Sequence, residues 1–229
     1  MRASFFISFF VVLYSSASAQ WSVNTISDSL INNSNAVIRR YASDITIFET
    51  GRIVVAENFV ITIFDNAELN QLRFYSIISD SHISESLESK IFDASGKRNK
   101  QASAKIFQEG AISSSNGSML RLFSPMELSF PLTIELEYRR TIKSFNDIHP
   151  WKPVTDFGVS VQNASFRLSV SDTSLIKFKS AGIPLPTKYV NEDGFYVFLW
   201  ESKNKISIKK GNSQELPLNS FPSLTLISK

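Results

Sequence analysis

The chain has 229 residues, 12% aromatic residues, a formal net charge of +3 and no cysteine. Without cysteine, a disulfide framework, a thiol nucleophile and a thiolate metal site are excluded, and the small positive excess without a Lys/Arg run argues against a nucleic-acid partner. A chain of this length buries roughly 70% of its unfolded surface, so one domain needs neither metal nor disulfide to fold.

Residues 1–19 have the pattern of a secretory signal peptide. Arg2 precedes an apolar run over 5–14, and small residues follow, ending at Ala19. The run is about half of what a bilayer span requires. We expect cleavage after Ala19, a mature chain that starts at Gln20, and a periplasmic or secreted protein without stable membrane insertion. The alternative is an uncleaved anchor or a buried segment.

The first part of the mature chain is predicted to hold a leader and two long strands. Residues 20–35 are polar and are interpreted as a leader or short helix. Strands are predicted over 36–49 and 52–65, with a turn at Thr50-Gly51 between them. Both faces of the second strand are apolar near Phe59, which indicates a central strand covered on two sides or lying against a partner.

Shorter strands are predicted next, over 72–78, 83–92 and 98–107. A Ser/Gly-rich loop is predicted over 108–117, and residues 119–123 lead into the next predicted strand. The spacing in 83–92 fits a helix as well as a strand. The turn Asp93-Ala94-Ser95-Gly96 that follows favours a strand, because glycine there suits a hairpin.

The strongest periodic signal lies over residues 130–140. Four apolar residues, Leu132, Ile134, Leu136 and Tyr138, alternate with Thr133, Glu135, Glu137 and Arg139. Successive side chains of a strand point to opposite faces, so the pattern predicts a half-buried antiparallel strand with its charges in water. A shift of one residue would bury both glutamates, so the register is strongly specified.

The rest of the chain is predicted to be strand-rich. Strands are expected over 157–161, 164–170, 176–178, 195–200 and 206–208, with a loop over 144–153. The fold class is therefore all-β, an antiparallel β-sandwich of about ten or more strands spanning residues 36–215. Residues 216–229 are a tail or a linker to a missing following domain. Its apolar residues 224–227 are expected to dock on the domain's own sheet edge or to offer an unpaired edge to a partner.

Several short motifs occur in a particular order. They are Asn35-Ala36-Val37-Ile38-Arg39, Ile91-Phe92-Asp93-Ala94-Ser95-Gly96-Lys97, Phe130 to Tyr138, Pro150-Trp151-Lys152-Pro153 and Phe198-Leu199-Trp200. In that order and spacing they resemble the uncharacterised N-terminal module that precedes transglutaminase-like domains in secreted bacterial proteins. The resemblance covers nearly the whole mature chain. It implies that a domain with a Cys, His and Asp triad usually follows, and it implies either a truncated frame or a stand-alone copy of the non-catalytic module.

Candidate chemistry is sparse. Asp80, Ser81 and His82 are adjacent and cannot form a triad geometry unless distant residues contribute. Glu135 and Glu137 are roughly 7 Å apart at two strand rises, a separation that could serve glycoside hydrolysis, but two acids on a solvent face are far commoner. No catalytic residue, metal site or cofactor is therefore assigned.

Four residues are candidates for binding a partner: Trp151, His149, Leu224 and Leu226. Trp151 lies between prolines in a loop, where it could be an exposed platform for a sugar or peptide or could fold back onto the core. His149 near Asp147 could ligate a metal, although ordinary loop polarity is favoured. The expected function is a non-catalytic module that binds a protein domain or a cell-envelope polymer. The alternative is a hydrolase or enzyme subunit with an unrecognised carboxylate site.

Overall fold

A computed structural model describes the chain over residues 20–32, 34–65, 76–78, 82–99, 107–110, 119–123, 129–142, 144–154, 157–191, 193–208 and 221–228. Residues 76–78, 82–85, 87, 107–110, 119–123 and 228 are described by their backbone alone. The predicted signal peptide, the residues Asp80 and Ser81, and the segments 72–75 and 100–106 lie outside the described residues. No helix in the described ranges is long and apolar enough to cross a membrane.

Strands dominate the structure. In chain order they are β1 (Ala36–Ile47), β2 (Ile53–Ile63), β3 (Ser76–Ile78), β4 (His82–Phe92), β5 (Phe107–Gly110), β6 (Met119–Phe123), β7 (Leu132–Ile142), β8 (Val159–Val170), β9 (Ile176–Ala181), β10 (Thr187–Val190), β11 (Tyr196–Lys205) and β12 (Ser223–Ser228). The helical elements are short: η1 (Val23–Thr25), α1 (Asp28–Ile31), η2 (Phe145–Asp147) and η3 (Thr173–Leu175).

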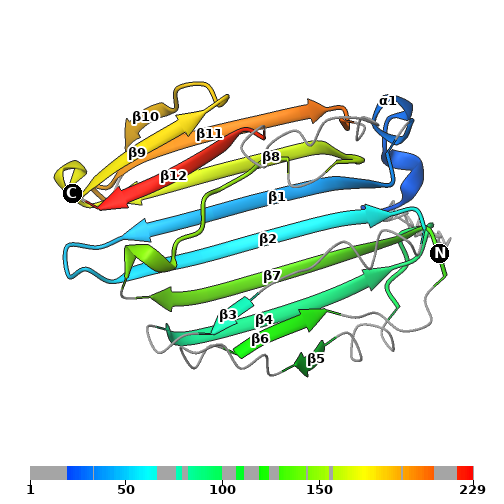
Figure 1. Ribbon diagram of the computed structural model, residues 1–229, viewed down its shortest axis with the longest axis horizontal. Coiled ribbons are helices and arrows are strands. Elements are labelled where there is room, and N and C mark those ends of the chain that lie inside the picture. The colour runs from blue at the N-terminus through cyan, green and yellow to red at the C-terminus, as the bar shows by residue number, and fades with distance from the viewer. Residues whose placement is uncertain are drawn as a thin grey trace, which may run out of the picture.

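Seven strands form one large sheet in the order β10-β11-β8-β1-β2-β7-β4 (Figure 1). The prediction of an all-β chain is confirmed. The prediction of a purely antiparallel arrangement is wrong at one place, because β1 runs parallel to β8 while its other neighbour, β2, is antiparallel. The sheet is therefore mixed. Two smaller sheets are formed by β12-β9 and by β3-β6-β5.

One face of the large sheet, here called the covered face, is overlaid by other parts of the chain. The pair β9–β12 and the segment 144–154 cross in front of it (Figure 1). Alternate residues of the central strands point to this face and form the main core, together with residues from the covering elements; they include Ile38, Ile45, Ile61, Ile134, Phe166, Leu168, Trp200, Phe221 and Leu224. Burial of this aliphatic and aromatic surface is the main stabilising contribution.

The opposite face, here called the outer face, carries polar residues and is covered at one end by the N-terminal segment 20–31. Ile26 and Leu30 of that segment pack against Val37 of β1. Trp21, within the predicted leader, is only 8% exposed. The expectation that Thr133 and Glu135 face water is also wrong: Thr133 is 0% exposed and donates to the Trp21 carbonyl, and Glu135 is 9% exposed and pairs with Lys90.

Several boundaries differ from the predictions. Strand β7 begins and ends two positions later than the predicted 130–140. The predicted loop over 108–117 contains the end of β5. The two strands predicted over 157–161 and 164–170 are one continuous strand, β8, which begins at Val159. Residues 206–208 follow β11 without forming a strand, although the Gly158 N–H donates to the Ile208 carbonyl at 3.0 Å. Residues 223–228 of the tail are docked, because they form β12, which pairs antiparallel with β9.

Candidate functional site

Two of the predicted partner-binding residues hold the covering layer together. The backbone N–H of Trp151 donates to the Leu224 carbonyl at 2.8 Å, and the backbone N–H of Leu224 donates to the Trp151 carbonyl at 2.9 Å. Trp151 is 2% exposed and Leu224 is 1% exposed. Trp151 also contacts Phe166 of β8, with ring centroids 5.7 Å apart. It therefore folds back onto the core and offers no platform to a ligand.

The other two predicted residues do not form a site with them. Leu226 is 8% exposed and belongs to the main core. His149 is exposed in the covering segment. Within the described residues, no group of three or more His, Cys, Asp or Glu side chains could hold a metal ion. The sequence-based candidates are thus mostly structural.

A different set of residues interrupts the aliphatic covered face. We call it the Glu57 patch and define it as Tyr41, Ser43, Glu57, Phe59, Tyr138 and Arg140. Cross-strand pairing brings them together: Tyr41 lies opposite Phe59, Ser43 opposite Glu57, and Glu57 opposite Tyr138. Arg140 follows on the same face of β7. Three adjacent strands therefore place polar and aromatic groups side by side in the middle of the sheet.

The Glu57 carboxylate is held by local donors. The Ser43 hydroxyl donates to it at 3.2 Å, and the Tyr41 hydroxyl also donates to it. Burial raises the pKa of Glu57, and this effect outweighs the charge of Arg140 and the two hydrogen bonds, which act in the opposite direction. Burial and the neighbouring Glu57 charge also raise the pKa of Tyr41. A carboxyl group in this setting can hold a proton more tightly than an exposed glutamate.

Arg140 links the patch to the covering segment. Its Nη2 donates to the Asp147 carbonyl at 2.9 Å, and its guanidinium carbon lies 5.5 Å from the centre of the Tyr138 ring. The side chain is 6% exposed. Arg140 therefore fixes η2 over the sheet and supplies a positive charge near Glu57.

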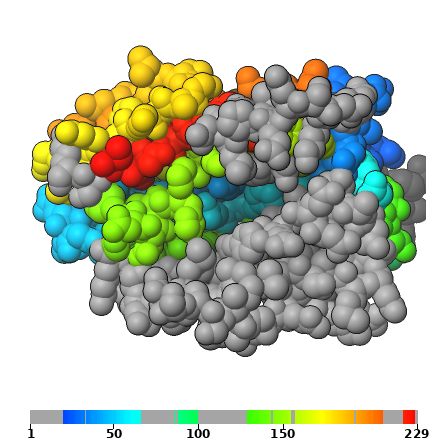
Figure 2. Space-filling model, in the orientation of Figure 1, coloured from blue at the N-terminus to red at the C-terminus, as the bar shows by residue number. Residues whose placement is uncertain are grey.

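The patch lies where the covered face is least protected. Figure 2 shows a hollow beside β12 and the segment 144–154, with β2 visible at its floor. On β1 and β2, the covered-face residues with partial exposure are Tyr41, Glu57 and Phe59, whereas Ile38, Ile45, Val55 and Ile61 are at most 2% exposed. Tyr41, Glu57 and Phe59 are therefore the partly exposed residues of the covered face on these two strands.

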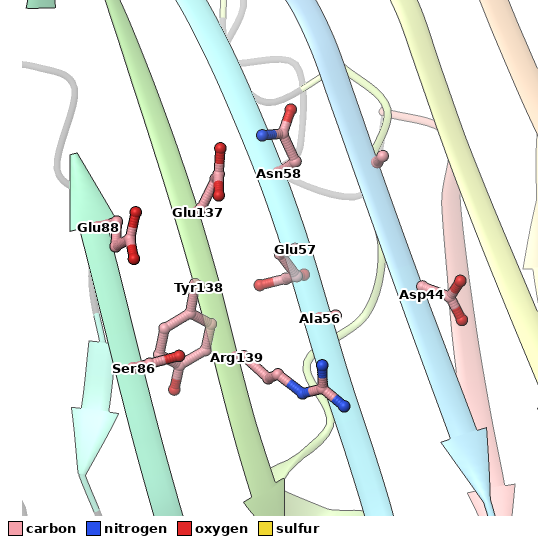
Figure 3. A pocket seen from close by; sticks show the side chains of 10 residues that line it. Asp44, Ala56, Glu57, Asn58, Ser86, Glu88, Glu137, Tyr138 and Arg139 are labelled. Carbon is pink, nitrogen blue, oxygen red and sulfur yellow. The ribbon is translucent and has the colours of Figure 1, made fainter. Parts of the chain in front are cut away.

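The outer face has a depression of about 450 Å³ behind the same strands (Figure 3). Its lining includes the small residues Ala42 and Ala56 and four charged residues: Asp44, Glu88, Glu137 and Arg139. Glu88 and Glu137 lie directly opposite each other on β4 and β7. Two like charges in this position are unfavourable. Lys90 offsets them, since its ammonium lies 2.8 Å from Glu137 and 3.5 Å from Glu135.

Sequence reasoning missed Glu57, although a signal was present. The residues Ile53, Val55, Phe59, Ile61 and Ile63 alternate along β2, and Glu57 occupies the same row. A charged residue at an apolar-face position is costly unless it is hydrogen-bonded, so it marks a place that needs partners. The row itself could have identified the patch.

The comparisons with known proteins agree with this fold. A family model for a domain of unknown function, DUF3857, matches residues 49–207. The chain belongs to the DUF3857 family. The matched region runs from the turn before β2 to the end of β11, and it includes Glu57, Tyr138 and Arg140. The resemblance to an uncharacterised module is thereby confirmed. No curated protein matches the chain.

Among solved structures, one from Parabacteroides distasonis ATCC 8503, described as a "putative protease", is similar with a TM-score of 0.66 and 15% sequence identity. The similarity covers 84% of this chain and 40% of that one. The similarity to an M1 zinc metallopeptidase from Deinococcus radiodurans covers 84% of this chain and 42% of that one, with 9% identity and a TM-score of 0.38. The similarity to the yeast LTA4 hydrolase covers 84% of this chain and 29% of that one, with 12% identity and a TM-score of 0.34. Only the first supports a common fold.

Proposed function

We propose that this chain is a non-catalytic, extracytoplasmic module that binds and positions a protein domain, and that the Glu57 patch is part of the contact surface. One observation carries the proposal: the structural similarity to the longer chain from Parabacteroides distasonis extends over 84% of this chain but only 40% of that one. A fold that recurs within a longer chain suits a module that works beside another domain. The resemblance of the sequence motifs suggests a transglutaminase-like domain as that partner.

We infer also that the large sheet and its covering strands act as one sandwich-like unit. Support comes from the shared core, in which Leu224 and Phe221 of the C-terminal segment pack with Phe166 and Trp200 of the sheet. Because β12 belongs to the layer on the covered face, a domain tethered after it would start beside that layer, at the edge of the molecule where β12 ends (Figure 1). Tethering raises the effective concentration of such a domain at that surface.

The test is a fusion of the mature chain, 20–229, to a transglutaminase-like domain from a longer family member through a protease-cleavable linker. After cleavage, co-elution of the two parts in gel filtration supports the proposal, and separate elution at micromolar concentration contradicts it. Tyr41→Ala combined with Phe59→Ala should weaken co-elution. Glu201→Gln is the matched control, because Glu201 is an exposed residue of β11, away from the patch.

The alternative is a hydrolase that uses Glu57 as a proton donor. The raised pKa of Glu57, caused by burial, favours this reading over one based on Glu135 and Glu137, which pair with Lys90. Turnover of fluorogenic glycosides or peptides that is abolished by Glu57→Gln, in a variant that still folds, would support the alternative. Turnover that survives Glu57→Gln would contradict it.

A further inference from the structure

The strand β10 forms one edge of the large sheet. It stands first in the order β10-β11-β8-β1-β2-β7-β4, and among the described strands only β11 pairs with it (Figure 1). All of its residues, Thr187–Val190, are exposed. An edge strand presents a row of backbone N–H and C=O groups that another strand can use for pairing. One long side of β10 is therefore open.

The turn between β10 and β11 determines which backbone groups face the open side. The Asn191 N–H donates to the Phe195 carbonyl at 3.0 Å, and the Asn191 side-chain oxygen accepts from the Phe195 N–H, also at 3.0 Å. In antiparallel strands, residues that bond to the neighbour alternate with residues that do not. Tyr189, two positions before Asn191, therefore directs its N–H and C=O toward β11. The N–H and C=O groups of Lys188 and Val190 face the open side.

The side chains at this edge favour contact with another strand. Three of the six large apolar side chains that are exposed in the described part of the chain lie in or just before β10: Leu185 (87%), Tyr189 (43%) and Val190 (59%). A lysine on an edge strand usually opposes pairing. The Lys188 ammonium, however, lies 5.3 Å and 5.6 Å from the centres of the Tyr196 and Phe198 rings. Its charge is thus held against β11.

We propose that β10 is a self-association site, at which it pairs antiparallel with β10 of a second copy of this chain around a two-fold axis. The open backbone groups belong to Lys188 and Val190, so these residues form the hydrogen-bonded pairs. In the register centred on Tyr189, Lys188 of each copy lies opposite Val190 of the other, and each such pair exchanges two backbone hydrogen bonds. The two large sheets then become one continuous sheet.

The two-fold axis makes this edge its own complement. In the register centred on Tyr189, no charged residue of β10 lies opposite a like charge. A register centred on Lys188 would place the two lysines opposite each other, which is unfavourable. Two-fold contacts between identical surfaces are the commonest arrangement of homo-oligomers. This proposal goes beyond the proposed function and does not depend on the domain that the module positions.

The first experiment uses the chain 20–229, which has no cysteine, so that one introduced cysteine reports on one position. Tyr189→Cys should give a disulfide-linked dimer in air, because opposite residues of a non-hydrogen-bonded pair have Cα atoms about 4.5 Å apart. Ile208→Cys is the control: Ile208 is 45% exposed but bonds to Gly158, at the other end of β8 from the residues that face β10 and β11. Equal dimer yields in non-reducing gels would overturn the proposal.

The second experiment is sedimentation equilibrium over a series of protein concentrations. Because only one short strand takes part, we expect a dissociation constant on the order of 0.1 mM for the parent chain. Val190→Pro should raise it about tenfold or more, because proline removes an open N–H from each copy and none of the N–H groups that bond to β11. Circular dichroism checks that the variant keeps its sheet.

Val190→Thr is the matched control, because threonine keeps the backbone N–H and the branched shape of valine. This variant should dimerise like the parent chain. A parent chain that stays monomeric at about 1 mM, ten times the expected dissociation constant, would overturn the proposal. Folded Val190→Pro protein that dimerises as strongly as the parent would overturn it too.

Discussion

The two faces of the central strands are stabilised by different interactions. On the covered face, Ile38, Ile61 and Ile134 are fully buried against the covering layer. On the outer face, charged pairs such as Arg167 and Asp44 lie across neighbouring strands in contact with water. Apolar burial contributes roughly 25 cal/mol per Å², whereas an exposed ion pair contributes about 0–1 kcal/mol. The same strands should therefore tolerate very different changes on their two sides.

The largest expected effect is a charge placed in the core. Leu136→Asp should destabilise the protein by more than about 4 kcal/mol, because Leu136 is 7% exposed on the covered face and a buried unpaired carboxylate is costly. Glu137→Lys, one residue away on the outer face, should cost at most about 1 kcal/mol through loss of the Lys90 pair. Denaturant midpoints compare the two. Similar midpoints would mean that the faces are assigned wrongly.

The next effect concerns the docked tail. Leu224→Ala should cost about 2–5 kcal/mol, because Leu224 is 1% exposed in the main core. Each kcal/mol corresponds to roughly 2–4 °C in melting temperature for a chain of this size. Ile227→Ala is the control from the same strand, since Ile227 is 45% exposed. Melting curves in which both variants match the parent protein would show that β12 contributes nothing to stability.

A smaller effect should depend on pH. The folded protein binds the Glu57 proton more tightly than the unfolded chain, whose carboxyl titrates near 4.5. The free energy of unfolding should therefore fall as pH rises from that value through the raised folded pKa. The groups facing Glu57 are Arg140, Tyr41 and Ser43. Glu57→Gln should remove this loss, so the variant should gain stability relative to the parent as pH rises above about 4.5.

Asp93→Asn provides the control of opposite sign. Hydrogen bonds from Ser95 and Lys97 lower the pKa of Asp93, so its contribution is present above the unfolded pKa and is lost as pH falls. Urea titrations at several pH values measure both variants. A Glu57→Gln curve parallel to that of the parent across the range would contradict the electrostatic account of the patch.

The smallest effect should come from the outer face. Asp44→Asn removes the partner of Arg167, whose Nη1 lies 3.1 Å from the Asp44 carboxylate. Both side chains are about two-fifths exposed, so we expect a cost of about 0.2–1 kcal/mol that shrinks at about 1 M salt. Thermal melts at low and high salt measure it. A larger, salt-independent loss would show that this face is not governed by screened charges.

The sequence predicted the structure best where apolar and polar residues alternate without interruption. The alternation from Leu132 to Tyr138 correctly predicted β7 and its covered face. The sequence also shows that the tail is apolar, but it does not decide between a docked strand and an unpaired edge. The strand it joins, β9, lies more than forty positions earlier, and no local pattern encodes that pairing.

The candidate site was less predictable than the fold. Trp151 was singled out because of its flanking prolines, yet its indole is buried by Phe166 and by the bridge to Leu224. The position of Trp21 depends on Arg39 and Arg40, where an irregularity in the β1–β2 register occurs. Such contacts arise only when distant elements meet. Glu57 was the exception, since its place in an apolar row is visible in the sequence itself.

The parallel pairing of β1 with β8 has a consequence for how the protein is made. Arg39 and Gln162, which hydrogen-bond across these strands, are 123 positions apart in the chain. When synthesis has passed β2, one side of β1 is paired, but its other side has no partner until β8 emerges. Non-local pairing of this kind slows folding, and an open strand edge in the meantime invites aggregation. The N-terminal half should therefore not persist as a folded fragment, and a growing chain needs protection for that edge until its second half arrives.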